Sequence, residues 1–215
     1  MKILNFDISN VGVVLTSHPK HQKFMDQGIK SYDGWKGGPI ILAYDDINMN
    51  KLPLKIWQPP ITHTICSGKY PGKLGHVKGE LTLMMLGGRL LEELGIEYIY
   101  KSAADTTCYR HYRFKDLKKE LNNNNVNFIR SGTAGIFGRV KDYNRVLRNV
   151  EKDVRSHIGA AELYWGRYEK KEKFTKRGVR GYFNNILGRI HIQGEYAFNT
   201  HQTVKDTWKI GEIWK

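Results

Sequence analysis

Acidic residues that directly follow apolar runs are the part of this 215-residue sequence best suited to chemistry. Asp105 follows the run Glu97–Ser102, and Asp45-Asp46 follow the run Pro39–Tyr44. Carboxylates at the ends of buried strands lie where open α/β sheets bind ligands. Carboxylate oxygens also suit Mg²⁺ or Mn²⁺. Since a basic, glycine-rich segment precedes Asp105, the pattern predicts a metal ion that holds a diphosphate.

The elements that must position these carboxylates are apolar runs that alternate with helical patterns. Such alternation favours an α/β domain with a largely parallel sheet. The carboxyl ends of parallel strands share one edge, so Asp45-Asp46 and Asp105 are expected to converge there. Strands are predicted at Val11–Thr16, Pro39–Tyr44, Ile61–Ser67 and Glu97–Ser102; helices at Lys20–Tyr32 and Leu81–Leu94, the second entered through a glycine- and lysine-rich loop at Ser67–Lys78.

The second half of the chain is less regular. It predicts a helix at Phe114–Leu121, a strand at Asn127–Arg130, a basic helix at Arg139–Val154 and a late strand at Arg189–Phe198. Ser131–Gly138 is rich in glycine but lacks Gly-Lys-Ser/Thr, so it is no Walker A motif. We expect one domain over residues 1–215, with a ligand-binding half at 1–110 and a basic half at 111–215.

The order of these motifs resembles the nucleotide-sugar-binding half of glycosyltransferases with the GT-A fold. The resemblance is carried by Val13–Ser17, by Gly75–Gly79, and by the run Gly88–Tyr100 before Asp105. It covers roughly residues 11–140. It implies a GT-A-like (Rossmann-like), mostly parallel sheet flanked by helices, and a nucleotide sugar, with a UDP-sugar favoured, as the donor.

The resemblance also implies roles for matching positions. Asp45 or Asp46 would contact the nucleoside, and Thr16 and Ser17 would border the same pocket. Lys78 would meet the diphosphate, since lysine offers phosphate a compact charge. Asp105 would bind the Mg²⁺ or Mn²⁺ that stabilises the departing diphosphate. Asp45-Asp46 could equally begin a turn, because Asp and Asn favour turns.

One departure from the family concerns the metal. The family usually shows Asp-x-Asp, whereas this chain has Ala103-Ala-Asp105, so only the last position is filled. The metal would need another ligand, would bind weakly or would be absent. His191 and His201 are candidates, because the family can recruit a C-terminal histidine; each could instead be an ordinary surface or hydrogen-bonded histidine.

Catalysis in an inverting enzyme needs a base for the acceptor hydroxyl. Glu162 fits, because small residues precede it and aromatic residues follow it in Gly159–Trp165. It could also be an exposed helical glutamate, and a retaining enzyme would not need it. Ser131–Gly138 would shape the sugar and acceptor pocket, with Phe137 as a wall, or would be a flexible loop.

Positive charge is concentrated in the second half. Residues 1–100 carry 11 Lys/Arg and 9 Asp/Glu (+2), and residues 101–215 carry 24 and 12 (+12), which together give +14. Cations interleaved with aromatic residues are typical of nucleic-acid binding, although an ordinary basic surface over core aromatics would look the same. The candidate nucleic-acid-binding residues are Arg139, Arg145, Arg148, Lys171, Lys173 and Arg177.

A basic acceptor side favours DNA that carries hydroxymethylated pyrimidines, as in phage-type DNA-modifying glycosyltransferases. The alternatives are transfer to a cell-surface or lipid-linked glycan, and a non-catalytic DNA-binding protein with a glycosyltransferase-like shell. Cys66 and Cys108 are expected to be reduced thiols. With no signal peptide and no long apolar run, we expect a cytoplasmic protein (host cytoplasm for a viral one) without stable membrane insertion. The sugar, the stereochemistry and the oligomeric state stay open.

Overall fold

Seven strands form one sheet in the computed structural model, which describes residues 7–17, 22–44, 58–67, 71–131, 135–153, 165, 174–176 and 182–188. The strand order across the sheet is β3-β2-β1-β4-β6-β5-β7. The strands are β1 (Val11–Ser17), β2 (Ile40–Tyr44), β3 (His63–Cys66), β4 (Tyr98–Ala103), β5 (Phe128–Ser131), β6 (Gly135–Arg139) and β7 (Phe174–Lys176).

The sheet is mostly parallel. β1 pairs in parallel with β2 on one side and with β4 on the other, and β2 pairs in parallel with β3. β6 runs antiparallel to both β4 and β5, while β5 and β7 are parallel. A mostly parallel, GT-A-like sheet flanked by helices was the expected fold class, and the topology confirms it.

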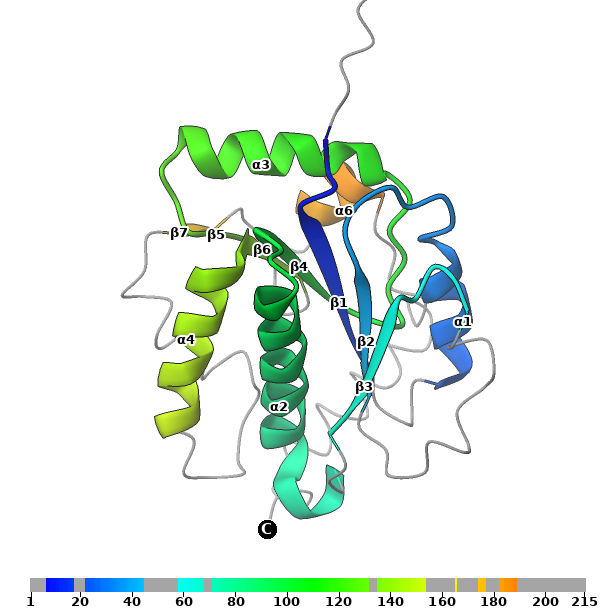
Figure 1. Cartoon of the computed structure of the whole chain (residues 1–215), viewed down its shortest axis with the longest axis vertical. Coiled ribbons are helices and arrows are strands. Elements are labelled where there is room, and N and C mark those ends of the chain that lie inside the picture. The colour runs from blue at the N-terminus through cyan, green and yellow to red at the C-terminus, as the bar shows by residue number, and fades with distance from the viewer. Residues whose placement is uncertain are drawn as a thin grey trace, which may run out of the picture.

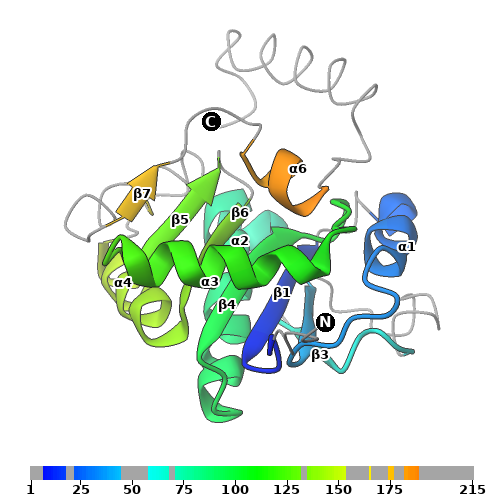
Figure 2. The same ribbon diagram turned by 90° about the horizontal axis from the view of Figure 1, so that it is seen from above.

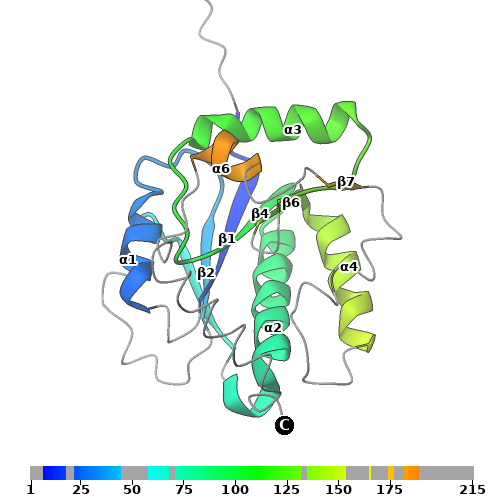
Figure 3. The same ribbon diagram turned by 180° about the vertical axis from the view of Figure 1, so that it is seen from behind.

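Helices cover both faces of the sheet (Figure 1). Apolar side chains of α2 and α4 form one core with Val14, Ile41 and Ile99. The opposite face of the sheet packs against α1, α3 and α6 (Figure 3). The helices are α1 (Gln22–Lys30), α2 (Pro71–Glu93), α3 (Phe114–Asn123), α4 (Val140–Asp153), α6 (Tyr182–Leu187) and the 3₁₀ turn η4 (His111–Arg113). No helix in the described ranges is long and apolar enough to cross a membrane.

The predicted strands of the first half are confirmed. All seven residues of β1 and all five of β2 are buried, as expected of central strands covered on both faces. α2 lies close to β1, because a Cβ added to Gly87 would stand 2.4 Å from Cγ1 of Val14. The helices expected near Lys20–Tyr32, Phe114–Leu121 and Arg139–Val154 are also present, as α1, α3 and α4. The strand expected at Arg189–Phe198 lies outside the described residues.

Two predictions about glycine-rich segments are wrong. The segment expected to be a loop before Lys78 is helical from Pro71, because proline is well suited to the first turn of a helix. The expected loop at Ser131–Gly138 contains the end of β5 and most of β6. Phe137 is therefore no pocket wall: it is fully buried and stacks on Tyr98 at 5.9 Å between ring centroids.

Candidate functional site

The site is defined by the point where the strand order reverses. From β1 the chain continues outward to β2 and β3, and then crosses back to β4 on the other side of β1. The two connections lie on opposite faces, α1 on one and α2 on the other. Open α/β sheets bind ligands at the carboxyl ends of the strands that flank such a reversal. Here those ends are Thr16-Ser17 of β1 and the residues that follow Ala103 of β4, which pairs with Thr16.

Asp105 lies in a buried turn directly after β4, and its exposed fraction is 1%. The turn is tied to β1, because the backbone N–H of Ala104 donates to the carbonyl of Thr16 at 2.9 Å. α1 closes the other side: a Cβ on Gly28 would stand 1.9 Å from the carbonyl oxygen of Ala104. The turn that carries Asp105 is therefore held between β1 and α1, at the strand end predicted from the sequence.

The chain after Asp105 is fixed to the end of α1. The Oγ of Ser31 accepts a hydrogen bond from the backbone N–H of Cys108 at 2.8 Å. His111 Nε2 lies 2.9 Å from the carbonyl of Ser31 and 2.7 Å from that of Cys108, so this nitrogen is the donor. Burial lowers the pKa of His111 below its usual value, while both carbonyls oppose that shift.

The two hydroxyls at the end of β1 are turned toward the flanking helices. The Thr16 hydroxyl donates to Glu80 Oε1 of α2 at 3.0 Å, and the Ser17 hydroxyl donates to Met25 Sδ of α1 at 2.7 Å. Both side chains are 4% exposed. Each hydroxyl thus fixes a helix to β1, and contact of Thr16 and Ser17 with a nucleoside stays a prediction.

A buried ion pair that sequence reasoning missed lies beneath this edge. Lys101 Nζ of β4 stands 2.5 Å from Glu80 Oε1, the same oxygen that Thr16 contacts. The side chains are 5% and 22% exposed. Glu80 therefore joins α2 to both strands that flank the reversal point. The available signal was a lysine inside the apolar run Tyr98–Ala103, which predicts a buried partner without saying which one.

An aromatic pair continues this cluster toward α4. Tyr143 packs against Trp165 at 5.2 Å between ring centroids, and both are buried. Burial and the nearby carboxylate of Glu80 raise the pKa of Tyr143 well above its usual value, so it stays protonated. Neither its hydroxyl nor Trp165 Nε1 has a hydrogen-bond partner within the described part of the chain.

Two hydroxyls bracket Asp105 in sequence and were also missed. Ser102 and Thr106 are 1% exposed, and neither side-chain oxygen has a hydrogen-bond partner in the described ranges. Buried hydroxyls are ordinarily paired, so both are open to a polar group that completes this edge.

The remaining predicted donor-site and catalytic residues are not placed. Asp45, Asp46, Glu162, His191 and His201 lie outside the described residues, as do Lys171, Lys173 and Arg177. The backbone of Lys78 lies in α2, but its side chain is outside the described part. β2 ends at Tyr44, at the same edge as Ser17 with which Tyr44 pairs, so the chain enters Asp45-Asp46 from the edge that carries Asp105.

Metal ligands are sparse in the part of the chain that is described. No three His, Cys, Asp or Glu side chains there are grouped so as to hold a metal. Asp105 alone is compatible with Mg²⁺, which is commonly bound by one or two carboxylates together with substrate phosphates and water. Binding of a metal ion by Asp105 therefore stays a prediction.

The predicted basic residues of the second half differ in their surroundings. Arg139 is bonded within the fold, where its Nη2 donates to Asn122 Oδ1 at 2.7 Å. Arg145 is exposed but pairs with Asp142 at 2.7 Å. Arg148 is exposed on the same helix, α4. Over residues 140–150 of α4, the exposed cations are Lys141, Arg145 and Arg148.

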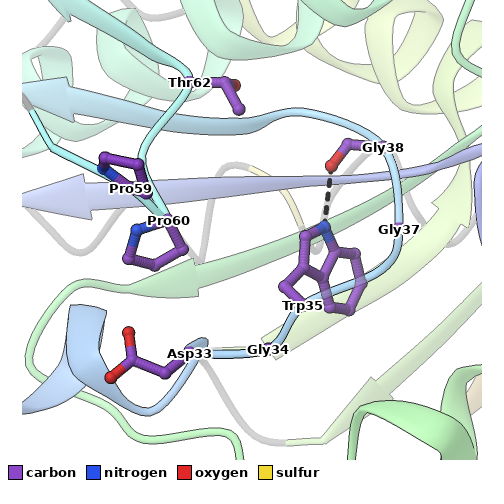
Figure 4. A pocket seen from close by; sticks show the side chains of 8 residues that line it. All are labelled: Asp33, Gly34, Trp35, Gly37, Gly38, Pro59, Pro60 and Thr62. Atoms are coloured by element: carbon purple, nitrogen blue, oxygen red, sulfur yellow. Dashed lines mark hydrogen bonds between the residues drawn. The ribbon is translucent and has the colours of Figure 1, made fainter.

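A pocket of about 320 Å³ lies at the opposite edge of the sheet (Figure 4). Trp35 forms one wall, and its Nε1 already donates to the carbonyl of Gly38 at 2.7 Å. Because the pocket is beside the amino ends of β2 and β3, it is separate from the edge that carries Asp105. Its lining residues are Asp33, Gly34, Trp35, Gly37, Gly38, Pro59, Pro60 and Thr62.

Comparison with known proteins gives a likeness in structure and none in sequence. No protein-family model and no curated protein matches the sequence. Among solved structures, the chain is similar to a protein from Desulfovibrio desulfuricans G20, provisionally named a nucleotide-diphospho-sugar transferase. The identity is 9%, the TM-score is 0.49, and the match covers 80% of each chain.

Proposed function

We propose that this protein is a glycosyltransferase that moves a sugar from a nucleotide sugar to a hydroxyl acceptor, with a nucleoside diphosphate as the leaving group. The observation that carries the proposal is the position of Asp105: a buried carboxylate at the carboxyl end of β4, beside β1, where the strand order reverses. This is the place where an α/β sheet binds a nucleotide. The resemblance of the motif order to GT-A enzymes supplies the reaction class.

The donor would lie across the carboxyl ends of β2, β1 and β4. The three strands are in register there, with Thr16 opposite both Ala43 and Ala103. Asp45 or Asp46 would contact the nucleoside and Lys78 the diphosphate. The unpartnered hydroxyls of Ser102 and Thr106 are further polar groups near Asp105. They are suited to donating hydrogen bonds to phosphate oxygens or to metal-bound water.

A Mg²⁺ or Mn²⁺ bound by Asp105 would neutralise charge on the departing diphosphate. The protein's own part is to hold this carboxylate at a fixed distance from the donor, which the bonds of the Ala104 turn to β1 and its contact with α1 favour. In an inverting transfer, the acceptor oxygen bonds to the anomeric carbon as the bond to the diphosphate breaks, and the Glu162 carboxylate takes the hydroxyl proton.

The favoured acceptor is a hydroxymethylated pyrimidine in DNA. The support is the charge of the second half, 24 Lys/Arg against 12 Asp/Glu. Arg148 and the exposed face of α4 are candidates for contact with phosphates. A base inside a duplex must be extruded before its hydroxymethyl group can react, at a cost of a few kcal/mol.

Mass spectrometry of hydroxymethylated DNA, incubated with the protein, a panel of nucleotide sugars and Mn²⁺ or Mg²⁺, tests the proposal. We expect the mass of one hexose or pentose on the modified base with at least one donor. Unmodified DNA is the matched control and should gain nothing. Slow release of the nucleoside diphosphate without DNA modification would support the transferase function and reject DNA as its acceptor. No release from any donor would reject the transferase.

A further inference from the structure

Two exposed tyrosines lie close together in the chain, immediately after the buried Asp105 turn. Large hydrophobic side chains are exposed at three positions in the described residues: Leu94 (43%), Tyr109 (53%) and Tyr112 (58%). Both tyrosines lie in the five-residue segment Tyr109–Arg113, and the arginine beside Tyr109, Arg110, is also exposed. We name this segment the tyrosine surface.

The tyrosine surface has a rigid backbone. The N–H groups of Tyr109 and Arg110 donate to the carbonyl of Leu187 in α6 at 3.0 and 2.9 Å, and Arg113 N–H donates to Arg110 O at 3.0 Å. The ring of His111 stacks on Tyr32 at 5.5 Å between centroids. The segment is therefore fixed to α6 and to the end of α1, between which it leads into α3 (Figures 2 and 3).

Arg110 is supported by its own contact. A Cβ added to Gly188 would stand 3.3 Å from Cγ of Arg110, and Gly188 has φ +61°, a conformation that favours glycine. The arginine stem thus runs along the backbone after α6. Aromatic side chains that protrude from a fixed backbone lose little entropy on binding, which favours a binding role over accidental exposure.

Charge selects the class of partner. Residues 109–119 carry five Lys/Arg and one Asp, a balance of +4. Within this stretch Arg113 pairs with Asp116 at 2.9 Å and Lys118 Nζ donates to Asn10 Oδ1 at 2.6 Å, so only part of this charge is open to a ligand. A positive segment with protruding aromatic rings has the two features by which proteins bind single-stranded nucleic acid: cations for phosphates and rings on which unpaired bases stack.

We propose that the tyrosine surface binds single-stranded nucleic acid, with bases stacked on Tyr109 and Tyr112 and a phosphate at Arg110. Its use as an acceptor subsite rests on the proposed glycosyltransferase function, whereas the binding itself does not. The surface follows Asp105 by four residues in the chain, but His111 within it lies 5.3 Å from Trp35 between ring centroids, beside the pocket at the amino ends of β2 and β3.

Fluorescence anisotropy with two labelled probes tests this binding. The first is an oligothymidylate of about fifteen nucleotides, and the second is an abasic deoxyribose-phosphate polymer of equal length and charge. Tyr109→Ala and Tyr112→Ala are each expected to weaken oligothymidylate binding about fivefold or more and to leave abasic binding unchanged. Tyr→Phe at either position should keep the affinity, because the stacking ring remains.

Leu94→Ala is the matched control, since it removes an equally exposed apolar side chain elsewhere and should change nothing. Arg110→Gln should weaken binding to both probes. It should also reduce the slope of log affinity against log salt concentration by about one, as expected for the loss of one phosphate contact. Urea unfolding of each variant checks that the fold is kept. The proposal would be overturned if the alanine variants lost equal affinity for the two probes or kept the wild-type affinity for both. It would also be overturned if heparin binding fell in the same tyrosine variants, because heparin has no bases to stack.

The outcome is separable from that of the donor site. Release of nucleoside diphosphate from a nucleotide sugar without acceptor should be unaffected by the tyrosine variants. Loss of oligonucleotide binding with normal donor hydrolysis locates the effect in the tyrosine surface. Tyrosine-dependent binding in a protein that hydrolyses no donor would support the surface and reject the transferase.

Discussion

Replacement of Lys101 by methionine tests the buried ion pair that joins α2 to the central strands. The substitution keeps an unbranched side chain of similar length, but it removes the ammonium that lies 2.5 Å from Glu80 Oε1. Removal of one partner from a fully buried pair costs about 3–5 kcal/mol, because the other charge stays buried. Glu80 is 22% exposed and still accepts a hydrogen bond from Thr16, so water and that hydroxyl reduce the penalty. We expect Lys101→Met to lower the free energy of unfolding by about 2–3 kcal/mol.

Urea unfolding followed by tryptophan fluorescence and by circular dichroism gives this free energy. Lys119→Met on the exposed face of α3 is the matched control, with an expected change within about 0.5 kcal/mol. The double variant Glu80→Gln, Lys101→Met should recover to within about 1 kcal/mol of the wild type, because no buried charge is left unpaired. The pair would not stabilise the fold if Lys101→Met left the free energy of unfolding nearly unchanged. The same would follow if the double variant lost as much free energy of unfolding as the two single variants together.

Three further predictions concern the packing around the site. Gly28→Ala should lower the free energy of unfolding by about 1–3 kcal/mol in urea, because its Cβ would stand 1.9 Å from the backbone oxygen of Ala104; the exposed neighbour Gln27→Ala should be nearly neutral. Burial lowers the pKa of His111, so its contribution to stability is fully present above about pH 6.5 and is lost as the pH falls toward the lower folded pKa. In His111→Gln, the free energy of unfolding, measured at successive pH values, should fall less over this range. The same dependence on pH in the variant and the wild type would contradict this role of His111. Tyr143→Phe should be neutral or stabilising by up to about 1 kcal/mol in thermal unfolding, since the hydroxyl has no hydrogen-bond partner within the described ranges, and a clear loss of stability would show that the hydroxyl is bonded.

The central strands could be predicted from the sequence because they are covered on both faces. β1 and β2 are continuous apolar runs, which are typical of strands buried on both faces of a parallel sheet. The start of α2 could not, because glycine and lysine near Pro71 indicate a loop when packing is unknown. β6 could not be predicted for a similar reason, because a glycine at position 138 indicates a loop. In the structure a Cβ there would stand 2.5 Å from the ring of Phe128, so close packing requires glycine.

The site was predictable in part. The strand end at Asp105 follows from local sequence alone, and the topology brings it to the same edge as Thr16 and Ser17. The orientation of the two hydroxyls could not be predicted, because it depends on Glu80 and Met25 from separate helices. Pairing of Glu80 with Lys101 depends on how α2 crosses the sheet, and nothing in the spacing of the two residues fixes that crossing.

Donor turnover by Asp105→Asn decides whether this carboxylate acts on the departing diphosphate. The substitution keeps the shape of the side chain and removes the negative charge of the carboxylate that is proposed to bind the metal ion of the donor diphosphate. With the nucleotide sugar that the wild-type protein hydrolyses, we expect kcat to fall about a thousandfold, because several kcal/mol of leaving-group stabilisation is lost. Urea unfolding of the same variant should show that the fold is kept. A folded Asp105→Asn protein whose turnover stays within about twofold of the wild type would show that Asp105 has no part in the reaction.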